Sequence, residues 1–453
     1  MAKGLTVLVL AAGRGTRMRS AVAKVLHPVL GRPLLAWVLD VARGLPATRR
    51  GVIVGFQAEA VARAVPPGFE IVHQERLWGT GHAVRQARRL FAGAGDTLVL
   101  SGDTPLLAAG TVRRLLAHHR RRRAAVSFLT ARLAEPAGYG RVLRCGEGRV
   151  KAIVEHDDAP PEVREIREVN AGVYCFENRF LGQALGRLRA ANRQDEYYLT
   201  DVVAAAVRAG LAVAGVPCDD PEAMLGVNDR AQLAQVSDVL RRRVLARLMR
   251  AGVTVVDPDS TWVEPSVRVG ADSVLFPGTT LQGTTVVAAG CHVGPFARLR
   301  DSRLGTGSVI RDCCVIEASA IGPRCQVGPF AHLRPGTRLD AGVRLGNFVE
   351  TKKAHLREGA KASHLSYLGD AEIGRRTNVG AGTITCNYDG FSKFRTTIGD
   401  DVFVGSDTQL IAPVRVGRRS AQPASTFCGV RETTSAPAGT SFVTVVPAAT
   451  SAP

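Results

Sequence analysis

A six-residue period of aliphatic residues constrains the fold of the second half of the chain. An aliphatic side chain recurs at every sixth position in three series, over residues 263–299, 315–345 and 398–416, and glycine often follows it. No helix has this period, whereas each hexapeptide of a parallel β-helix buries one aliphatic residue in a shared core. Three hexapeptides form one triangular coil. The period therefore predicts a parallel β-helix of roughly nine coils over residues 252–417.

Two interruptions of the period mark candidate binding loops. The phase is lost in ETKKAHLREGAKASHLSYLGD (350–370) and again in CNYDGFSKFRTT (386–397). Insertions in solenoids form loops that often carry the binding face, so irregular loops are expected at both places. After residue 420 no phase can be recovered, because Gln422 stands where an aliphatic residue is due. An irregular tail is therefore expected over residues 421–453.

The first part of the chain follows a different pattern. Up to residue 228, short apolar runs such as LTVLVLAAG and DTLVLSGD alternate with helical stretches such as AGTVRRLLAHH. This alternation predicts an α/β domain around a largely parallel sheet, whose ligands bind at the carboxyl ends of the strands. Residues 229–250 contain no glycine or proline and repeat apolar residues at helical spacing. This pattern predicts a long linker helix over residues 229–251. The predicted domains are thus 1–228, the linker 229–251, 252–420 and the tail.

Composition narrows the functional classes. The formal net charge of +19 comes mainly from arginines that are spread along the chain, and no nucleic-acid motif accompanies them, so no nucleic-acid partner is expected. No 18-residue apolar window and no signal peptide are present, which predicts a cytoplasmic protein without a membrane partner. Nine cysteines without a CxxC pair favour reduced thiols over a disulfide framework.

The stretch LAAGRGTRM ends the first apolar run in a flexible, cationic loop. Gly13 and Gly15 allow consecutive backbone N–H groups to surround an anion, and Arg17 and Lys24 add positive charge. The spacing matches neither the dinucleotide-binding GxGxxG motif nor the GxxxxGK[ST] motif of P-loop ATPases. A loop of this kind at the end of a strand suits a nucleoside triphosphate.

This stretch resembles the signature of sugar-1-phosphate nucleotidyltransferases, and most of the chain resembles one family of them. The matching stretches, in chain order, include QERLWGTGHA, GDTPLL, GYGR, IVEHDDA, EYYLTD, GVNDR, VGPFAHLRPG, NFVETKKA, SHLSYLGDAEIG, VGAGTITCNYDG and DDVFVGSDTQLIAPV. From about Thr6 to Gly417 the chain is similar to the bifunctional N-acetylglucosamine-1-phosphate uridyltransferases/glucosamine-1-phosphate acetyltransferases. The resemblance implies a Rossmann-like pyrophosphorylase domain joined by a long helix to a left-handed parallel β-helix.

For the first domain, the resemblance implies uridylyl transfer from UTP to N-acetylglucosamine-1-phosphate with release of pyrophosphate. Such chemistry needs positioning and charge neutralisation rather than a covalent intermediate. Asp103 and Asn228 would hold Mg²⁺, because a carboxylate and an amide oxygen suit that ion. The other implied nucleotide-sugar positions are Leu10, Ala11, Ala12 and Gly13 in the loop, Arg17 and Lys24 at the phosphates, Gln74, Gly79 and Thr80 at the uracil, and Gly140, Glu155 and Asn170 at the sugar. Ala23 is a departure, since the family usually has a stiffening proline there.

For the second domain, the resemblance implies acetyl transfer from acetyl-CoA to glucosamine-1-phosphate. His364, in the expected irregular loop KASHLSYLG, matches the family's catalytic base, a role that histidine commonly has in proton transfer. The implied sugar-phosphate positions are Arg334, Lys352, Tyr367, Asn378 and Lys393, and the implied acetyl-CoA positions are Ala381, Asn387, Tyr388, Ser406 and, by a weak match, Ala424. In the family this site lies between the subunits of a homotrimer.

Three functional hypotheses remain open from the sequence. The first is the bifunctional enzyme, which supplies UDP-N-acetylglucosamine for cell-wall synthesis. The second is a uridylyltransferase whose β-helix serves only oligomerisation. The altered tail favours it, whereas His364, Asn387 and Ser406 in their family motifs argue against it. The third is a binding scaffold with a basic surface, which the pairing of Asp103 and Asn228 near a phosphate loop argues against.

Overall fold

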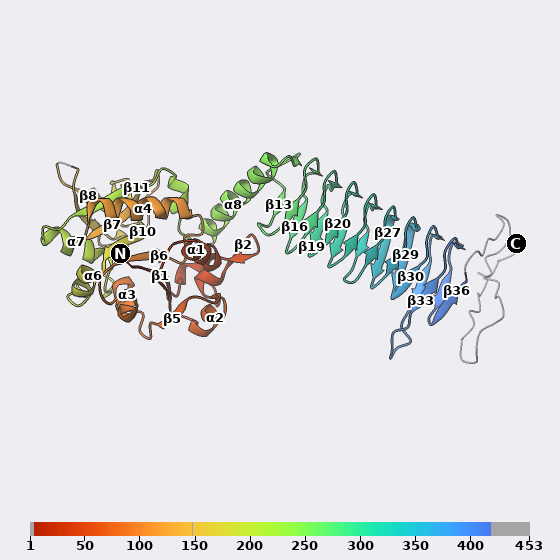
Figure 1. Ribbon diagram of the computed structural model, residues 1–453, viewed down its shortest axis with the longest axis horizontal. Helices are drawn as coiled ribbons and strands as arrows, with labels where there is room; N and C mark the ends of the chain where they lie inside the picture. The colour runs from red at the N-terminus through yellow and green to blue at the C-terminus, as the bar shows by residue number, and fades with distance from the viewer. Residues whose placement is uncertain (1–3, 147, 418–453) are drawn as a thin grey trace. The chain divides into compact units, whose positions relative to one another are not determined.

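The computed structural model describes residues 4–146 and 148–417, and the chain divides into two compact units between Leu240 and Arg241 (Figure 1). The irregular tail expected over residues 421–453, with Ala424 in it, lies outside the described residues.

The first unit is built on a nine-stranded sheet with the order β11-β7-β10-β6-β1-β4-β5, to which β8 and β9 add a hairpin. Its strands are β1 (Leu5–Ala11), β4 (Arg49–Val54), β5 (Glu70–His73), β6 (Asp96–Ser101), β7 (Val126–Arg132), β8 (Arg141–Arg144), β9 (Val150–Val154), β10 (Glu168–Glu177) and β11 (Val213–Pro217). Strands β4, β1 and β6 are parallel, but β10 runs antiparallel to both β6 and β7. The sheet is therefore mixed, because the chain returns from β7 through the β8–β9 hairpin rather than through a crossover helix.

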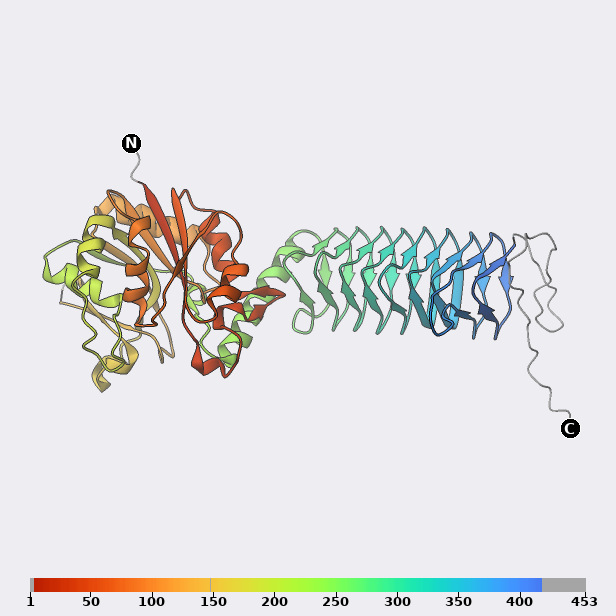
Figure 2. The same cartoon turned by 90° about the horizontal axis from the view of Figure 1, so that it is seen from below.

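Helices cover both faces of this sheet (Figure 2). They are α1 (Leu34–Arg43), α2 (Ala58–Arg63), α3 (Thr80–Gln86), α4 (Ala109–Arg122), α5 (Pro161–Arg164), α6 (Asn178–Leu185) and α7 (Thr200–Arg208), with the small hairpin β2 (Pro28–Val29) and β3 (Arg32–Pro33) beside them. Successive side chains of a strand point to opposite faces, so Val7 and Val9 of β1 enter one core cluster while Leu8 enters the other. This double burial explains why β1 is apolar throughout instead of alternating.

Helix α8 (Arg230–Arg250) follows, and the boundary between the two units falls within it. Its apolar residues Val236, Leu240 and Val244 are buried, at the spacing that brings side chains onto one face of a helix.

The second unit is a parallel β-helix with three stacks of strands (Figures 1 and 2). The first stack has β12 (Thr254–Val255), β15 (Val274–Leu275), β18 (His292–Val293), β21 (Val309–Ile310), β24 (Gln326–Val327), β27 (Arg344–Lys352), β29 (Lys361–Gly369), β31 (Asn378–Val379) and β34 (Phe403–Val404). The second has β13 (Trp262–Val263), β16 (Thr280–Gln282), β19 (Arg298–Arg300), β22 (Val315–Glu317), β25 (His332–Leu333), β27, β29, β32 (Ile384–Cys386) and β35 (Gln409–Ile411). The third has β14 (Arg268–Val269), β17 (Val286–Val287), β20 (Arg303–Leu304), β23 (Ala320–Ile321), β26 (Arg338–Leu339), β28 (His355–Leu356), β30 (Ala371–Ile373), β33 (Thr396–Ile398) and β36 (Val414–Val416). The nine strands of the third stack mark nine coils, as the period predicts.

One detail of the predicted period is wrong. Val315 is only half-buried, whereas its neighbour Ile316 has no exposed surface and points into the core. The inward positions run from Leu299 to Leu304 and from Ile316 to Ile321, so each of these two steps has five residues instead of six. A turn with one residue fewer shifts the phase of everything that follows it.

The first expected interruption is also wrong. Residues 350–370 continue the β-helix, because β27 and β29 are nine-residue strands that pair in register from Arg344 with Lys361 to Lys352 with Gly369. The period fades there because Thr351 and Ala362, both without exposed surface, take two of the inward positions. His364 consequently lies on strand β29 rather than in an irregular loop.

The second interruption is confirmed. The chain leaves the stack after β32 and returns at β33, and the intervening residues project from the coil as a loop (Figure 1). No helix in the described part of the chain is long and apolar enough to cross a membrane. The eight cysteines within the described ranges are all free thiols.

Candidate functional site

The loop after β1 brings Lys24 to two residues from distant parts of the first unit. The Lys24 Nζ donates to the Asp103 carboxylate and, at 3.1 Å, to the Asn228 Oδ1. Gly15 has a φ of 66°, and a β-carbon there would lie 2.6 Å from the Lys24 Cβ, so the loop needs a glycine for Lys24 to pass so close. The structure thus joins three predicted phosphate and metal residues in one cluster.

Backbone bonds hold the two oxygen ligands of this cluster. Asp103 follows the carboxyl end of β6, and its carbonyl oxygen accepts the Val227 N–H at 3.0 Å. The Asn228 N–H donates to the Gln232 Oε1 at 2.8 Å. The carboxylate and the amide oxygen converge on one positive charge, here the Lys24 ammonium. Oxygen ligands that face one cation are also the donor set that Mg²⁺ prefers, so these residues fit the ion.

A glutamine anchors the loop that carries Lys24. The Ala23 N–H donates to the Gln57 Oε1 at 2.9 Å, and the Gln57 Nε2 donates to the Ala21 carbonyl oxygen at 2.7 Å. Ala23 is buried with a φ of −56°, which is a value that proline also adopts. Gln57, which the sequence did not single out, therefore holds the backbone at the position where the family usually has proline.

The predicted uracil residues form a second group, in the loop that leads into α3. Gln74 is buried, and its Nε2 donates to the Gly79 carbonyl oxygen at 3.1 Å. Gly79 has a φ of 91°, and a β-carbon there would lie 2.8 Å from the Tyr197 carbonyl oxygen. The Thr80 Oγ1 accepts the Leu199 N–H at 3.0 Å. The loop is therefore docked on the EYYLTD segment.

The predicted sugar residues also lie together. A β-carbon at Gly140 would lie 3.2 Å from the Glu155 Oε2, and the Asn170 N–H donates to the Gly140 carbonyl oxygen at 2.9 Å. The Asn170 Nδ2 donates to the Tyr174 hydroxyl oxygen at 2.5 Å. Burial raises the pKa of Glu155, although the Thr200 hydroxyl, which donates to it at 3.0 Å, acts in the opposite direction. The group brings the half-buried Glu155 carboxyl close to the Asn170 amide, and both are groups that can bond sugar hydroxyls.

Other predicted residues around the loop after β1 form backbone hydrogen bonds to neighbouring segments. The Leu10 carbonyl oxygen accepts the Gly102 N–H at 2.9 Å, and the Ala12 carbonyl oxygen accepts the Phe56 N–H at 3.0 Å. These bonds tie the loop after Ala11 to the segments after β6 and β4. Gly13 has open space where a β-carbon would stand, and Arg17 lies in the short 3-10 helix η1 (Thr16–Met18) next to it.

In the second unit, three predicted sugar-phosphate residues form a cationic cluster. The close side chain of Lys393, together with its charge and that of Arg334, lowers the pKa of Lys352. The Arg334 Nη1 donates to the Glu350 Oε1 at 2.9 Å, and Tyr367 pairs in register with Glu350. Positive charges that crowd each other in this way suit a phosphate. Lys393 reaches the cluster from the projecting loop.

The predicted base lies near a corner of the same coil. His364 is exposed on β29, opposite Asn347 of β27, and Leu365 after it turns the corner with a φ of 31°. Tyr367 lies beyond this corner, in the second stack, while Asn378 pairs with Lys361 in the first. One chain therefore places His364 and the cationic cluster on either side of a corner.

The predicted acetyl-CoA residues occupy the last coils. The buried Asn387 donates from its Nδ2 to the Asp370 Oδ2 at 2.6 Å, and Tyr388 forms a backbone bridge with Lys393 in the projecting loop. The Ala381 carbonyl oxygen accepts the Asp407 N–H at 2.7 Å, which puts Ser406 in the coil next to Ala381.

Several supporting residues were missed at the sequence level although the motifs contain them. Thr200, which bonds Glu155, belongs to EYYLTD, and Asp370, which bonds Asn387, belongs to SHLSYLGDAEIG. Their position within a quoted motif was the available signal. Gln57 lies outside every quoted stretch, so no motif could have revealed it.

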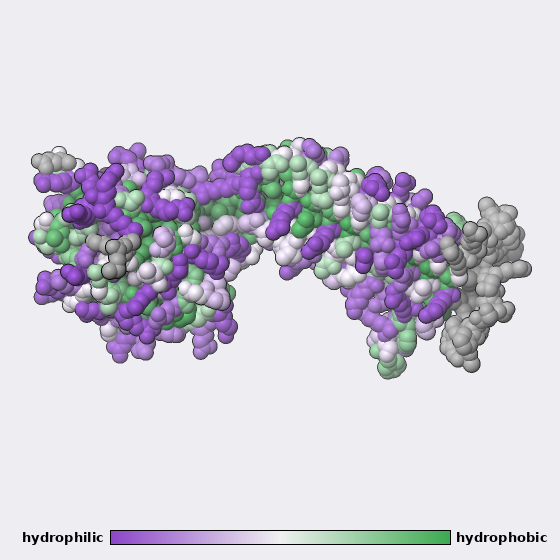
Figure 3. All heavy atoms as spheres, in the orientation of Figure 1, coloured by the Kyte–Doolittle hydropathy of each residue, from purple (hydrophilic) through white to green (hydrophobic). Residues whose placement is uncertain are grey.

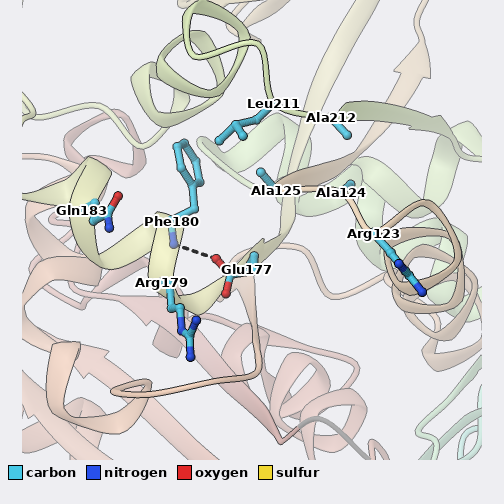
Figure 4. Close-up of a pocket in the computed structure, with 9 residues that line it drawn as sticks. All are labelled: Arg123, Ala124, Ala125, Glu177, Arg179, Phe180, Gln183, Leu211 and Ala212. Carbon is cyan, nitrogen blue, oxygen red and sulfur yellow. Dashed lines mark hydrogen bonds between the residues drawn. The ribbon is translucent and has the colours of Figure 1, made fainter.

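A hollow of about 350 Å³ in the first unit is separate from these groups. It is lined by Arg123, Ala124, Ala125, Glu177, Arg179, Phe180, Gln183, Leu211 and Ala212 (Figure 4). Glu177 pairs with Asp96 at the amino end of β6. The hollow therefore lies near the amino end of β6, whereas Asp103 follows its carboxyl end. The surface in view around the first unit is largely hydrophilic (Figure 3).

Comparison with known proteins agrees with this geometry. A family model described as a MobA-like NTP transferase domain matches residues 7–161. The first unit is therefore a nucleotidyltransferase domain, and a left-handed parallel β-helix follows it in the chain.

Relatives that match nearly the whole chain share one name. The bifunctional protein GlmU of Trichlorobacter lovleyi is 49% identical, over 92% of this chain and 92% of the relative. The bifunctional protein GlmU of Pelobacter propionicus is 48% identical, over 98% of this chain and 96% of the relative. The protein of the same name from an Exiguobacterium species is 48% identical over 91% of both. The chain belongs to the bifunctional protein GlmU family.

Proposed function

We propose that the first unit transfers a uridylyl group from UTP to N-acetylglucosamine-1-phosphate. The observation that carries this proposal is the meeting of Lys24, Asp103 and Asn228 beside the glycine-rich loop at the carboxyl ends of β1 and β6. The sugar phosphate oxygen attacks the α-phosphorus of UTP, a new P–O bond forms, and the bond to the β-phosphate breaks to release pyrophosphate. The reaction needs in-line positioning and stabilisation of charge on the phosphates.

The residues of the chain divide this task. Lys24 and Arg17 bind the phosphates, Gln74, Gly79 and Thr80 orient the uracil, and the sugar lies against Glu155 and Asn170. Asp103 and Asn228 would hold Mg²⁺, which supplies charge neutralisation when bound. The Lys24 ammonium bonds both oxygens, so it holds Asp103 and Asn228 together beside the phosphate-binding loop.

The second unit transfers the acetyl group of acetyl-CoA to the amine of glucosamine-1-phosphate. The amine nitrogen attacks the thioester carbon and forms a C–N bond, and His364 accepts the amine proton. The C–S bond breaks to release coenzyme A as a thiolate, which takes up a proton to become the thiol. Arg334, Lys352 and Lys393 bind the phosphate, with Tyr367 and Asn378 beside them. Ala381, Asn387, Tyr388 and Ser406 contact acetyl-CoA.

A homotrimer completes this second site. Exposed apolar residues follow one corner of the β-helix, namely Phe296, Phe330, Phe348 and Leu365, and we name them the corner ridge. The rings of Phe330 and Phe348 stack with centroids 5.4 Å apart. An exposed apolar ridge along one corner supports packing against a second copy. The predicted cytoplasmic location also belongs to this proposal.

Two matched variants test the division of labour. His364→Ala should abolish release of thiol from acetyl-CoA and leave pyrophosphate release from UTP nearly unchanged, whereas Asp103→Ala should do the reverse. Both variants should keep the wild-type size in gel filtration. Loss of both activities in a folded single variant would refute the assignment. If the wild type forms UDP-sugar without any acetyl transfer, the uridylyltransferase-only alternative is correct, although nothing in the comparisons favours it.

A further inference from the structure

Both amide hydrogens of Gln74 are used inside the protein. The Gln74 Nε2 lies 3.1 Å from the Gly79 carbonyl oxygen and 3.0 Å from the His82 Nδ1. A carbonyl oxygen can only accept, so the atom that faces Gly79 must be the amide nitrogen. Its second hydrogen then points to His82, and the Oε1 is the polar atom of Gln74 that is left for a ligand.

This arrangement fixes the state of His82. Its Nδ1 must accept a hydrogen bond, so the ring proton of the neutral imidazole is on Nε2. That nitrogen lies 2.9 Å from the Gln86 Nε2. Because a protonated ring nitrogen can only donate, we assign the Gln86 amide the opposite orientation, with its oxygen toward the ring. His82 is buried, with Trp78 and Tyr197 at centroid distances of 5.2 and 6.2 Å. Burial, followed by the charge of Arg85, lowers the pKa of His82, which favours the neutral ring.

We propose that His82 is a positioning residue that makes Gln74 selective for a base with a ring N–H, such as uracil, over cytosine. The inference rests on the proposed uridylyl transfer and adds a determinant of base specificity to it. Because His82 holds the amide nitrogen, Gln74 presents only an acceptor to the base. The N3–H of uracil donates to that acceptor. The N3 of cytosine carries a lone pair instead, so two acceptors would face each other without a proton.

The neighbouring backbone strengthens the restraint. Gly79 is fixed between Gln74 and the EYYLTD segment, because Tyr197 donates its N–H to the Trp78 carbonyl oxygen at 2.8 Å and accepts the Gly81 N–H at 2.7 Å. The Gly79 carbonyl oxygen therefore cannot turn to follow a rotated Gln74 amide. A flipped amide would place its oxygen against this carbonyl oxygen and against the His82 Nδ1, and both are acceptors.

The test compares His82→Leu with His82→Asn in the full chain. Leucine removes the acceptor, whereas the asparagine Oδ1 can take the place of the histidine Nδ1. The measurement is kcat/KM for UTP and for CTP, with N-acetylglucosamine-1-phosphate as co-substrate and pyrophosphate release as the readout. We expect the UTP:CTP ratio to fall about tenfold in His82→Leu, since one fixed hydrogen bond is lost, and to stay within about threefold of wild type in His82→Asn.

A milder variant covers the case in which His82→Leu does not fold. Gln86 is exposed, and Gln86→Leu removes the partner that keeps the ring proton on Nε2. We expect this variant to lower the UTP:CTP ratio about threefold without a change in melting temperature.

Two results would overturn the inference. One is a UTP:CTP ratio that stays at the wild-type value in His82→Leu and in Gln86→Leu. The other is an equal fall of kcat/KM for both nucleotides, which indicates a purely structural role. A wild-type protein that forms no UDP-sugar at all would instead refute the proposed function.

Discussion

Removal of the Gln57 side chain should slow uridylyl transfer although Gln57 is not among the proposed substrate-binding residues. Gln57 accepts the Ala23 N–H at 2.9 Å and donates to the Ala21 carbonyl oxygen at 2.7 Å, so it holds the segment directly before Lys24. A hydrogen bond of this kind contributes about 1 kcal/mol net, and two such bonds bound the effect at about 2 kcal/mol. If most of this energy restrains Lys24, then kcat/KM for UTP should fall about tenfold in Gln57→Ala.

The backbone of Ala23 supplies a matched control. With a φ of −56°, Ala23→Pro keeps the backbone angle, removes the N–H that Gln57 binds and stiffens the chain by its ring. In the Ala23→Pro background, Gln57→Ala should therefore cost only about threefold, the share of the remaining bond to Ala21. Alanine at position 57 brings no new strain, because glutamine already has a β-carbon at the same φ of 51°.

The assay is pyrophosphate release by the wild type, both single variants and the double variant, with the melting temperature of each as a control for folding. If Gln57→Ala lowered kcat/KM by the same factor in both backgrounds, Gln57 would not act through the Ala23 backbone, because the two positions would then be independent. An unchanged kcat/KM in Gln57→Ala alone would show that the Lys24 segment holds its place without it.

Two further predictions concern the β-helix. Ile316→Ala should destabilise the second unit by about 2–5 kcal/mol, whereas Val315→Ala should cost about 1 kcal/mol or less, because only Ile316 is fully buried; urea unfolding of both variants measures this, and equal costs would contradict the inward position of Ile316. Phe348→Glu should break the corner ridge, so that light scattering gives a monomer and thiol release from acetyl-CoA is lost while pyrophosphate release continues; a trimeric variant with full acetyl transfer would refute the role of the ridge.

The period predicted the second unit well because a β-helix repeats one simple requirement. Each coil needs an inward side chain at fixed intervals, so large aliphatic residues at those positions are visible in the sequence. The same reasoning failed where small or polar residues met the requirement. Thr351 and Ala362 are buried in the core, but one is polar and the other is small, so neither stands out in the sequence. The five-residue step from Ile316 to Ile321 is likewise not visible from the residue types.

The sequence named the residues of the proposed first site but not their arrangement. Motifs pointed to Lys24, Asp103 and Asn228, but the bond between Lys24 and Asn228 joins residues 204 positions apart. No local pattern encodes that meeting, which depends on the order of β1 and β6 in the sheet. Supporting contacts are even harder to predict from the sequence. A residue such as Gln57 acts through backbone groups of a different segment, so no motif or residue spacing marks it.

The arrangement of the second site follows from the geometry of the coil itself. Strand β29 carries His364 before the corner at Leu365 and Tyr367 after it, and the cationic cluster lies on the far side with Tyr367. A nucleophilic amine and a phosphate of one small sugar must reach the base and the cations together. In the proposed trimer, a neighbouring copy would supply one of these groups, because a corner separates them within one chain. The exposed corner ridge, which includes Leu365 itself, lies where such a copy would pack. Loss of trimer contacts should therefore cost acetyl transfer before it costs the fold of the β-helix.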